Sequence, residues 1–242
     1  MNFKYIRIFP IFFLIFILSG CLYPENELAK NQAPNEDQLE LVQRAIDKYV
    51  NEFDGLVPIK TKPSDTPIFE KYIIDFNMLK DNNFITDIPG NAFENGGIYQ
   101  YVLMTPEDDP RVKLIDLRVT EEIRKVNIQL DHYRSKHLYP PFGEEVSDGI
   151  YSINYKKLGF KNEPYVVSPY SNENLPIIMD MDGKIYIDYR IDLHKALTEL
   201  DHNYQEGEDI RYIIPEHTPF VPAYSLPYTI QNNEPVFMIN NN

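Results

Sequence analysis

The chain has 242 residues, a formal net charge of −14 at pH 7 and one cysteine. So acidic a chain argues against a nucleic-acid partner and against electrostatic binding to anionic lipid headgroups, because both need a positive surface. A single cysteine excludes an internal disulfide and a metal site made of several cysteines. With 43% hydrophobic and 13% aromatic residues, the chain can form one large or two small folded domains.

The N-terminal residues have the pattern of a targeting segment. Lys4 and Arg7 form a basic start, and the apolar run that ends at Leu18 is shorter than the roughly 20 residues that a membrane-spanning helix needs. Leu18-Ser19-Gly20-Cys21 resembles the lipobox of bacterial lipoproteins, whose cysteine is lipidated and becomes the new N-terminus. We therefore predict a signal peptide over residues 1–20 and a diacylglyceryl anchor on Cys21, on the extracytoplasmic side of the cell membrane. The alternative is an ordinary signal peptide with a chance cysteine.

A polar stretch, residues 21–37, follows and is rich in Asn, Glu and Pro. It has no apolar period, so we predict a flexible tether. Over residues 39–53 apolar side chains recur at steps of three and four, which predicts a helix. The pair Gly96-Gly97 precedes an aromatic stretch, 98–103, as is typical of a turn that enters a strand. We assign residues 38–110 to a first helix-plus-sheet unit.

A similar pattern indicates a second unit over residues 111–204. Apolar residues have helical spacing over 119–133, and Asp182-Gly183 between apolar runs is typical of a β-hairpin. A further helix is expected over 191–204. Residues 205–242 contain five prolines, and we predict an irregular C-terminal segment packed on the body.

The two units follow one order, which is a helix, a proline exit, a glycine turn and an aromatic strand. This order occupies residues 38–103 and again residues 119–189, with similar spacing and low identity. We interpret it as an internal duplication. The expected fold class is therefore α+β, with two tandem units that each contain a helix and a small antiparallel sheet.

This layout resembles the globular part of bacterial type II secretion pseudopilins. Two features of that class are missing. There is no long apolar N-terminal helix that continues into the domain, and Cys21 occupies the position of the prepilin-peptidase site. The resemblance therefore implies a layout for the fold and leaves filament formation unsupported.

Besides the lipobox, four stretches carry a second resemblance: Leu22-Tyr23-Pro24-Glu25, Pro58-Ile59-Lys60-Thr61-Lys62, Lys113-Leu114-Ile115-Asp116-Leu117 and Pro219-Phe220-Val221-Pro222-Ala223-Tyr224-Ser225-Leu226-Pro227-Tyr228. They resemble the YphF-type lipoproteins of bacilli, and the resemblance spans nearly the whole chain. Members are sometimes labelled as substrate-binding lipoproteins of ABC transporters. That label implies no defined site residues.

Motifs for catalysis are missing from the sequence. There is no Gly-x-Ser-x-Gly elbow, no Gly-x-x-x-x-Gly-Lys phosphate loop and no His-Glu-x-x-His pair. We therefore predict no catalytic residues and no cofactor. Asp180 and Asp182 precede Gly183 and, together with Asp188, resemble the start of a calcium-binding loop. The remaining ligands of an EF-hand are missing, so a hairpin turn is the preferred interpretation.

The many tyrosines provide candidates for ligand binding. Tyr186 and Tyr189 in the second unit, and Tyr224 and Tyr228 in the C-terminal segment, could line a groove for a peptide or a sugar. Tyrosines at the rim of a small sheet are more often core residues whose hydroxyl reaches water. Packing is therefore the competing interpretation.

Three classes of function are compatible with this sequence. The favoured one is a lipid-anchored, non-catalytic binding or interaction module at the cell envelope, whose partner is an envelope protein or a cell-wall component. The second is a solute-binding lipoprotein of an ABC transporter, which would need two lobes around a cleft. The third is an envelope hydrolase with an unrecognised site.

Overall fold

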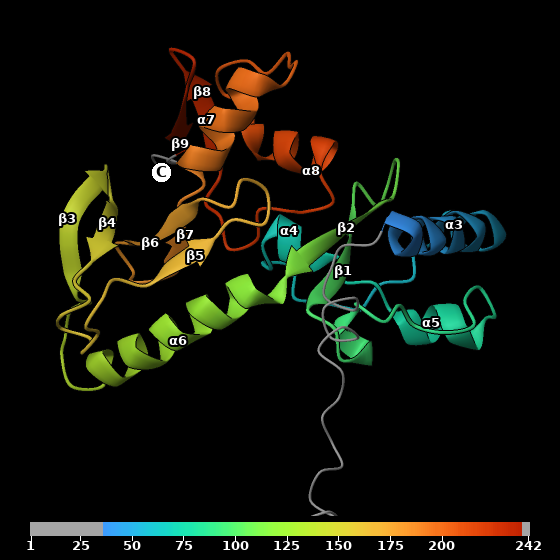
Figure 1. Cartoon of the computed structure of the whole chain (residues 1–242), viewed down its shortest axis with the longest axis horizontal. Helices are drawn as coiled ribbons and strands as arrows, with labels where there is room; N and C mark the ends of the chain where they lie inside the picture. Colours follow the sequence, from blue (N-terminus) through green and yellow to red (C-terminus); the bar gives the residue numbers. More distant parts are fainter. Residues whose placement is uncertain (1–35, 239–242) are drawn as a thin grey trace, which may run out of the picture. The chain divides into compact units, whose positions relative to one another are not determined.

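The computed structural model describes residues 36–238. The signal peptide, the stretch 22–25, Cys21 and nearly all of the tether lie outside these residues, so what the sequence predicts for them stays a prediction. Figure 1 shows the elements, which in chain order are α3 (Glu36–Glu52), α4 (Ile68–Lys71), α5 (Phe76–Asp81), η1 (Phe93–Asn95), β1 (Tyr99–Met104), β2 (Arg111–Asp116), α6 (Leu117–Arg134), β3 (Phe142–Ser147), β4 (Ile150–Ile153), β5 (Tyr165–Val167), β6 (Asn174–Asp180), β7 (Ile185–Ile187), α7 (Arg190–Glu199), η2 (Ile210–Tyr212), α8 (Ile213–His217), β8 (Tyr228–Gln231) and β9 (Glu234–Phe237).

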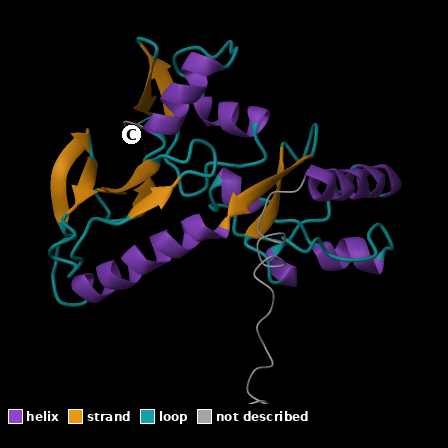
Figure 2. Cartoon of the chain, in the orientation of Figure 1, coloured by secondary structure: helices purple, strands orange, loops and turns teal. Residues whose placement is uncertain are grey.

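The fold is α+β, as predicted. Within the described residues the strands form three antiparallel sheets, a β1–β2 hairpin, a five-stranded sheet and a β8–β9 hairpin (Figure 2). The five-stranded sheet has the order β3-β4-β6-β5, with β7 also paired to β6. All strand pairs of these sheets are antiparallel, so the helices do not serve as crossovers between parallel strands.

The helix predicted over residues 39–53 corresponds to α3. One face of α3 is apolar, and it buries Val42, Ala45, Ile46 and Tyr49. These side chains share one core with buried residues of α5, β1 and β2. The three- and four-residue spacing of the sequence therefore reflects the packing of α3 on the first hairpin.

β1 and β2 pair along their whole length, from Tyr99 opposite Asp116 to Met104 opposite Arg111. The unit boundary predicted after residue 110 therefore falls next to the turn of a hairpin. At the end of β2, the Asp116 side chain accepts a hydrogen bond from the N–H of Arg118 and caps α6. Strand β2 thus runs directly into the long helix of the second half.

β6 is the central strand of the five-stranded sheet. β4 pairs with residues 178–180 of β6 and β5 pairs with residues 174–176. Pro176 O accepts the Asp188 N–H on the side of β7. Consecutive residues of a strand direct their backbone groups to opposite edges, so Leu175, which pairs with β5, faces the edge opposite β7. β4 pairs along that same edge, so β4 and β5 follow one another there. The chain leaves that edge between them in a loop, residues 154–164.

The segment of residues 219–225, here called the strap, forms hydrogen bonds to the β1–β2 hairpin and to the five-stranded sheet. Leu114 of β2 donates its N–H to Pro219 O at 2.8 Å and accepts the Val221 N–H at 3.0 Å. Ile187 of β7 donates its N–H to Tyr224 O at 2.8 Å. The strap therefore forms short parallel bridges to one strand of each sheet.

The C-terminal segment is more regular than predicted. It contains the short helix α8 and the β8–β9 hairpin, whose turn residues Asn232 and Asn233 have positive φ angles of 51° and 63°. Asparagine tolerates this conformation, which a tight hairpin turn requires. The prolines concealed this hairpin because Pro235 lies within β9 itself.

The helix expected over residues 191–204 is shorter in the structure. α7 ends at Glu199, because Leu200 has an extended backbone with φ −113° and ψ 146°. No helix of residues 36–238 has the length and apolar character that crossing a membrane would require.

The structure does not show the predicted duplication of residues 38–103 and 119–189. The first range contains three short helical segments and one strand after α3, whereas the second contains five strands after α6. A different repeat is visible instead. Ile115-Asp116-Leu117-Arg118 and Ile187-Asp188-Tyr189-Arg190 both join the second strand of a hairpin to a helix, and in each the aspartate binds the arginine two residues later.

Candidate functional site

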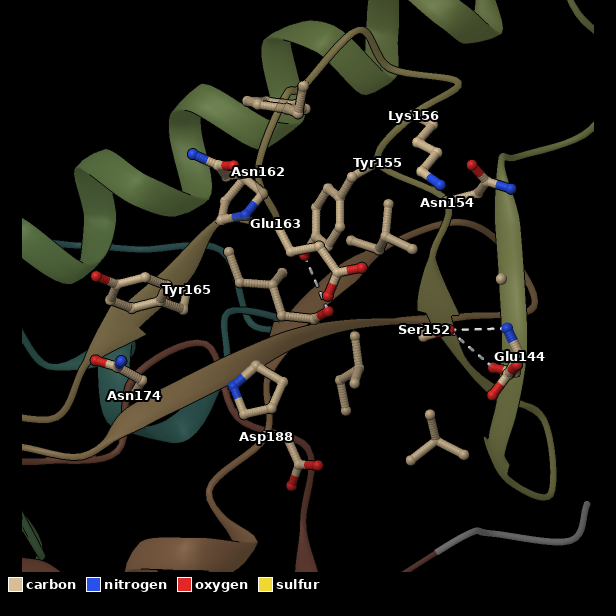
Figure 3. A pocket seen from close by; sticks show the side chains of 18 of the residues that line it. Glu144, Ser152, Asn154, Tyr155, Lys156, Asn162, Glu163, Tyr165, Asn174 and Asp188 are labelled. Carbon is tan, nitrogen blue, oxygen red and sulfur yellow. Dashed lines mark hydrogen bonds between the residues drawn. The ribbon is translucent and has the colours of Figure 1, made fainter.

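A cavity of about 1100 Å³ forms an open trough on the five-stranded sheet. It lies over the face of β6 that carries Asn174 and Pro176, while Leu175 points into the core. Figure 3 shows side chains from β3, β4, β6 and the 154–164 loop around it. Most of the polar lining comes from Glu144, Ser152, Asn154, Lys156, Lys161, Asn162, Glu163, Tyr165, Asn174 and Arg190.

The 154–164 loop forms one wall of the trough. Tyr155 is buried, and its hydroxyl donates to Ile177 O at 3.2 Å, where the gap between β4 and β5 leaves β6 without a strand partner. The ring of Tyr155 packs edge-to-face on Phe160, with centroids 5.9 Å apart. These contacts hold the loop against the sheet and leave Lys156 and Asn162 exposed at the rim.

The β3–β4 pair forms the opposite wall. Ser152 Oγ accepts the Glu144 N–H at 2.8 Å and donates to Glu144 O at 3.2 Å. This reciprocal bonding lies where the strand register shifts. A Cβ at Gly143 would come within 2.4 Å of Ser152 Oγ, so this position needs glycine. The Ser152 hydroxyl therefore stabilises the irregular strand pair.

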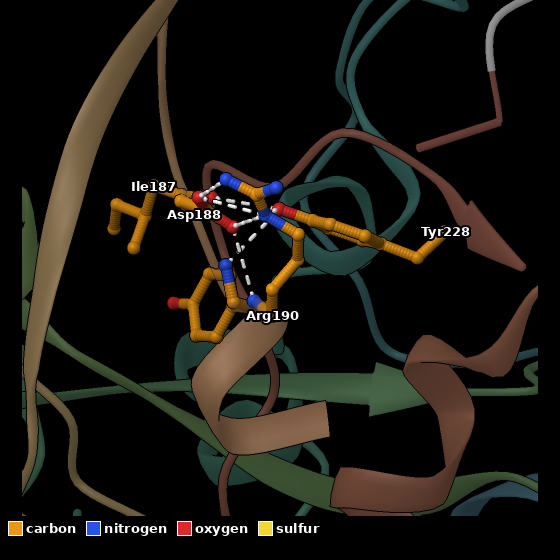
Figure 4. A network of polar contacts seen from close by, with 5 residues as sticks. Ile187, Asp188, Arg190 and Tyr228 are labelled. Atoms are coloured by element: carbon orange, nitrogen blue, oxygen red, sulfur yellow. Dashed lines mark hydrogen bonds and ion pairs between the residues drawn. The ribbon is translucent and has the colours of Figure 1, made fainter. Parts of the chain in front are cut away.

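Asp188 and Arg190, which follow β7, also line the trough, and Figure 4 shows the contacts between them. The Arg190 Nη2 lies 2.6 Å from Asp188 Oδ2, and its Nε is 3.0 Å from both carboxylate oxygens. Hydrogen bonding to Asp188 raises the pKa of the Arg190 guanidinium above its usual value. The guanidinium also lies over the Phe237 ring at 4.9 Å, which ties the trough to β9.

Two of the four candidate tyrosines belong to the core. Tyr228 is fully buried, and its hydroxyl accepts the Tyr189 N–H at 3.0 Å and lies 3.3 Å from Asp188 Oδ1 (Figure 4). Burial, followed by the charge of Asp188, raises the pKa of Tyr228 well above its usual value. Tyr189 is also buried, and its hydroxyl donates to Ala223 O at 3.0 Å. Both side chains are therefore structural.

The other two tyrosines lie away from the trough. Tyr186 and Tyr224 are half-buried and line a separate cavity of about 240 Å³ together with Glu70. The Tyr186 hydroxyl donates to Asp180 Oδ2 at 3.0 Å. The structure thus divides the four candidates between the core and this small cavity and brings none of them into the trough.

The candidate calcium ligands are also separated. Asp180 accepts the Lys184 N–H at 2.9 Å across the predicted hairpin turn, while Asp188 bonds to Arg190. The turn joins β6 to β7, and Gly183 has a positive φ of 77°. Among residues 36–238 no group of three or more His, Cys, Asp or Glu is arranged to hold a metal ion.

Sequence reasoning missed the residues that line the trough. Asn162 and Asn174 belong to no motif, and only the pairing of β5 with β6 brings Asn174 near Asn162 and Tyr165. One local signal was present in β5, where exposed Tyr165 and Val167 flank buried Val166. That alternation indicates a strand with one face in solvent.

Comparison with known proteins gives one match. Residues 35–116 match the model of the YphF family N-terminal domain, a range that ends with β2 and excludes the trough. No curated protein and no solved structure matches the chain. Residues 35–116, about a third of the chain, are therefore similar to the YphF N-terminal domain, and this similarity supports a protein of YphF type.

Proposed function

We propose that the protein is a lipoprotein anchored to the outer face of the cell membrane through Cys21, and that its body binds a cell-wall glycan without catalysis. The observation that carries this proposal is the trough of about 1100 Å³ on the five-stranded sheet. Its volume is slightly above the range of roughly 300–1,000 Å³ that is usual for small-molecule sites, and it is open, which suits one part of a longer chain.

The lining of the trough matches the chemistry of a sugar chain. The side-chain amides of Asn154, Asn162 and Asn174 both donate and accept hydrogen bonds, as sugar hydroxyls do. Tyr165 is 50% exposed and offers a ring face for the apolar side of a sugar. Lys156, Lys161 and Arg190 are balanced by Glu144, Glu163 and Asp188 in the lining, which suits a ligand with little net charge.

Several features favour binding over catalysis. Histidine and cysteine do not occur among the described residues that line the trough. The hydroxyl of Ser152 is held by the Glu144 backbone, and the carboxylate of Asp188 is held by Arg190. A hydrolase would need a nucleophile beside a base, or a tuned acid and base.

The solute-binding alternative has less support. Such a protein is expected to hold its ligand in a cleft between two lobes, whereas this trough is lined by residues 143–190 and lies on a single sheet. The C-terminal segment also has less support as a binding surface, because Phe220, Val221 and Tyr228 are buried.

Co-sedimentation with purified cell walls tests the proposal. The full chain in detergent is mixed with insoluble peptidoglycan, and the bound fraction is compared for the unmodified protein and for the double variant Asn162→Ala/Asn174→Ala. We expect at least a roughly tenfold weaker affinity for the double variant, because two polar contacts are lost. Asn51→Ala, on the exposed face of α3, is the matched control and should bind normally. Equal binding by all three proteins, or none by the unmodified protein, would contradict glycan binding in the trough.

A further inference from the structure

The outer edge of β5 carries unused backbone hydrogen-bonding groups. Ser168 donates its N–H to Glu173 O at 2.9 Å, so Ser168 and Val166 direct their amides toward β6. The N–H and C=O groups of Tyr165 and Val167 therefore point away from β6. Within residues 36–238 no other strand, bridge or side chain takes them up.

A groove of about 640 Å³ runs beside this edge. Pro164, Tyr165 and Val167 form one side of it, and the first two turns of α6 form the other through Arg118, Val119 and Glu122. Buried aromatic side chains, Tyr99 of β1 and Phe220 of the strap, contribute to its lining. An open strand edge thus faces a helix across a groove of mixed polar and apolar lining.

The charges around the groove are already paired. Arg118 bonds to Asp116 through two nitrogens, and Glu122 forms an ion pair with Lys125 at 2.6 Å. The groove therefore presents no net charge to a ligand. Its free functional groups are backbone donors and acceptors at the spacing of a β-strand, next to apolar side chains.

We propose that this groove binds an extended peptide segment of a partner protein, which adds to the sheet as a strand beside β5. Tyr165 and Val167 supply N–H and C=O groups to the peptide backbone, and their exposed side chains, with Pro164 beside them, contact apolar side chains at alternate positions of the peptide. The preferred segment is uncharged, because a charged side chain would find no unpaired partner in the groove.

This site is separate from the trough proposed for glycan. The two share Pro164 and Tyr165, and the remaining lining residues differ. Peptide binding goes beyond the proposed function and does not depend on it. Val167 lines the groove and not the trough, so a change at Val167 tests the peptide site alone.

The test begins with a display library of random octapeptides selected on the full chain in detergent. Affinities of the selected peptides are then measured for the variants Val167→Pro and Val167→Thr. Proline removes the N–H that points away from β6 and is tolerated at strand edges, whereas threonine keeps the N–H and the shape of valine. We expect about a tenfold or greater loss with Val167→Pro and little change with Val167→Thr. Cell-wall binding should be equal for both variants.

A second measurement covers the case in which Val167→Pro perturbs the fold. The selected peptides are N-methylated at one position at a time and measured against the unmodified protein. Methylation should abolish binding at alternate positions and be tolerated at those between, because only every second amide of an added strand faces β5. A selection without binders, or binders that tolerate both the proline and every N-methyl group, would overturn the proposal.

Discussion

The N–H of Tyr224 donates to Oε1 of Glu70 at 2.7 Å, although 154 residues separate the two. Tyr224 has a positive φ of 56°, which is uncommon for a residue with a side chain. Burial raises the pKa of Glu70 above its usual value, even though this hydrogen bond lowers it. The strap is thus fixed to α4 through a half-buried carboxylate.

Glu70→Ala should destabilise the fold by about 1–3 kcal/mol, because the Tyr224 N–H would lose its partner in a half-buried position. The free energy of unfolding in urea measures this loss. As a control, Glu107→Ala removes a glutamate side chain from the exposed β1–β2 turn and should change stability by less than about 0.5 kcal/mol. Equal values for the two variants would mean that the bond to the strap adds no stability.

Tyr155→Phe should lower the free energy of unfolding by about 1–2 kcal/mol, because Ile177 O would lose the hydrogen bond that replaces a missing strand partner. The ring remains, so packing on Phe160 is kept. Tyr139→Phe, at a side chain that is 75% exposed, is the control and should have no effect. If the two variants unfold at the same urea concentration, the hydroxyl of Tyr155 does not stabilise the loop.

Asp192 should make the protein less stable as pH rises, which is the opposite of the effect of a carboxylate whose pKa is lowered by folding. It is fully buried, and burial raises its pKa above the ordinary value of 3.8, although hydrogen bonds from Ser168 and Ser171 lower it. A folded-state pKa above the unfolded value means that the folded protein holds the proton more firmly. The contribution of Asp192 to stability therefore falls as pH rises from about 3.8 through the raised pKa.

The variant Asp192→Asn isolates this effect because asparagine does not titrate. The stability of the unmodified protein relative to the variant should rise as pH is lowered from 7 toward 4, when both are unfolded in urea. The exposed Asp201→Asn provides the control for all other carboxylates and should show no such rise. A difference that stays constant with pH would contradict the raised pKa.

Cys21→Ser should release the protein from the membrane fraction and remove the mass of the lipid, because serine cannot form the thioether of the anchor. Fractionation and mass spectrometry of the purified chain measure both effects. Ser19→Ala keeps a small residue in the lipobox and should leave retention unchanged. Membrane retention and mass that are unaltered in Cys21→Ser would show that the chain is not anchored there.

Local patterns predicted the elements that depend on local packing. The apolar spacing over residues 39–53 and 119–133 identified α3 and α6 to within a few residues, and Asp182-Gly183 identified the β6–β7 turn. Each of these signals lies within one element or one turn, where the sequence period follows from which face is buried. The fold class was accessible from the sequence for this reason.

Features that join distant residues were not predictable in this way. The trough needs Asn162 and Asn174 on the same side of a sheet whose edge is interrupted by a loop. The strap contains Pro219 and Pro222, a composition typical of irregular chain, and its strand-like bonds come from Leu114 and Ile187. Proline signals turns locally and carries no information on such partners.

The repeat that the structure does contain was visible in the sequence, but at residues that the predicted duplication did not align with each other. Ile-Asp-Leu-Arg at residue 115 and Ile-Asp-Tyr-Arg at residue 187 are short, and their significance depends on what surrounds them. In both, an aspartate that follows or ends a strand binds the arginine two residues later, in the first turn of a helix. A comparison that starts from helix periods aligns other residues and misses this junction.

The strap also determines the order in which the fold can be completed. Residues 219–225 follow Leu114 and Ile187 in the chain, yet they complete the hydrogen bonding of both residues. Without the strap, both strands have open edges that can pair with other chains. A chain that stops before Pro219 should therefore aggregate.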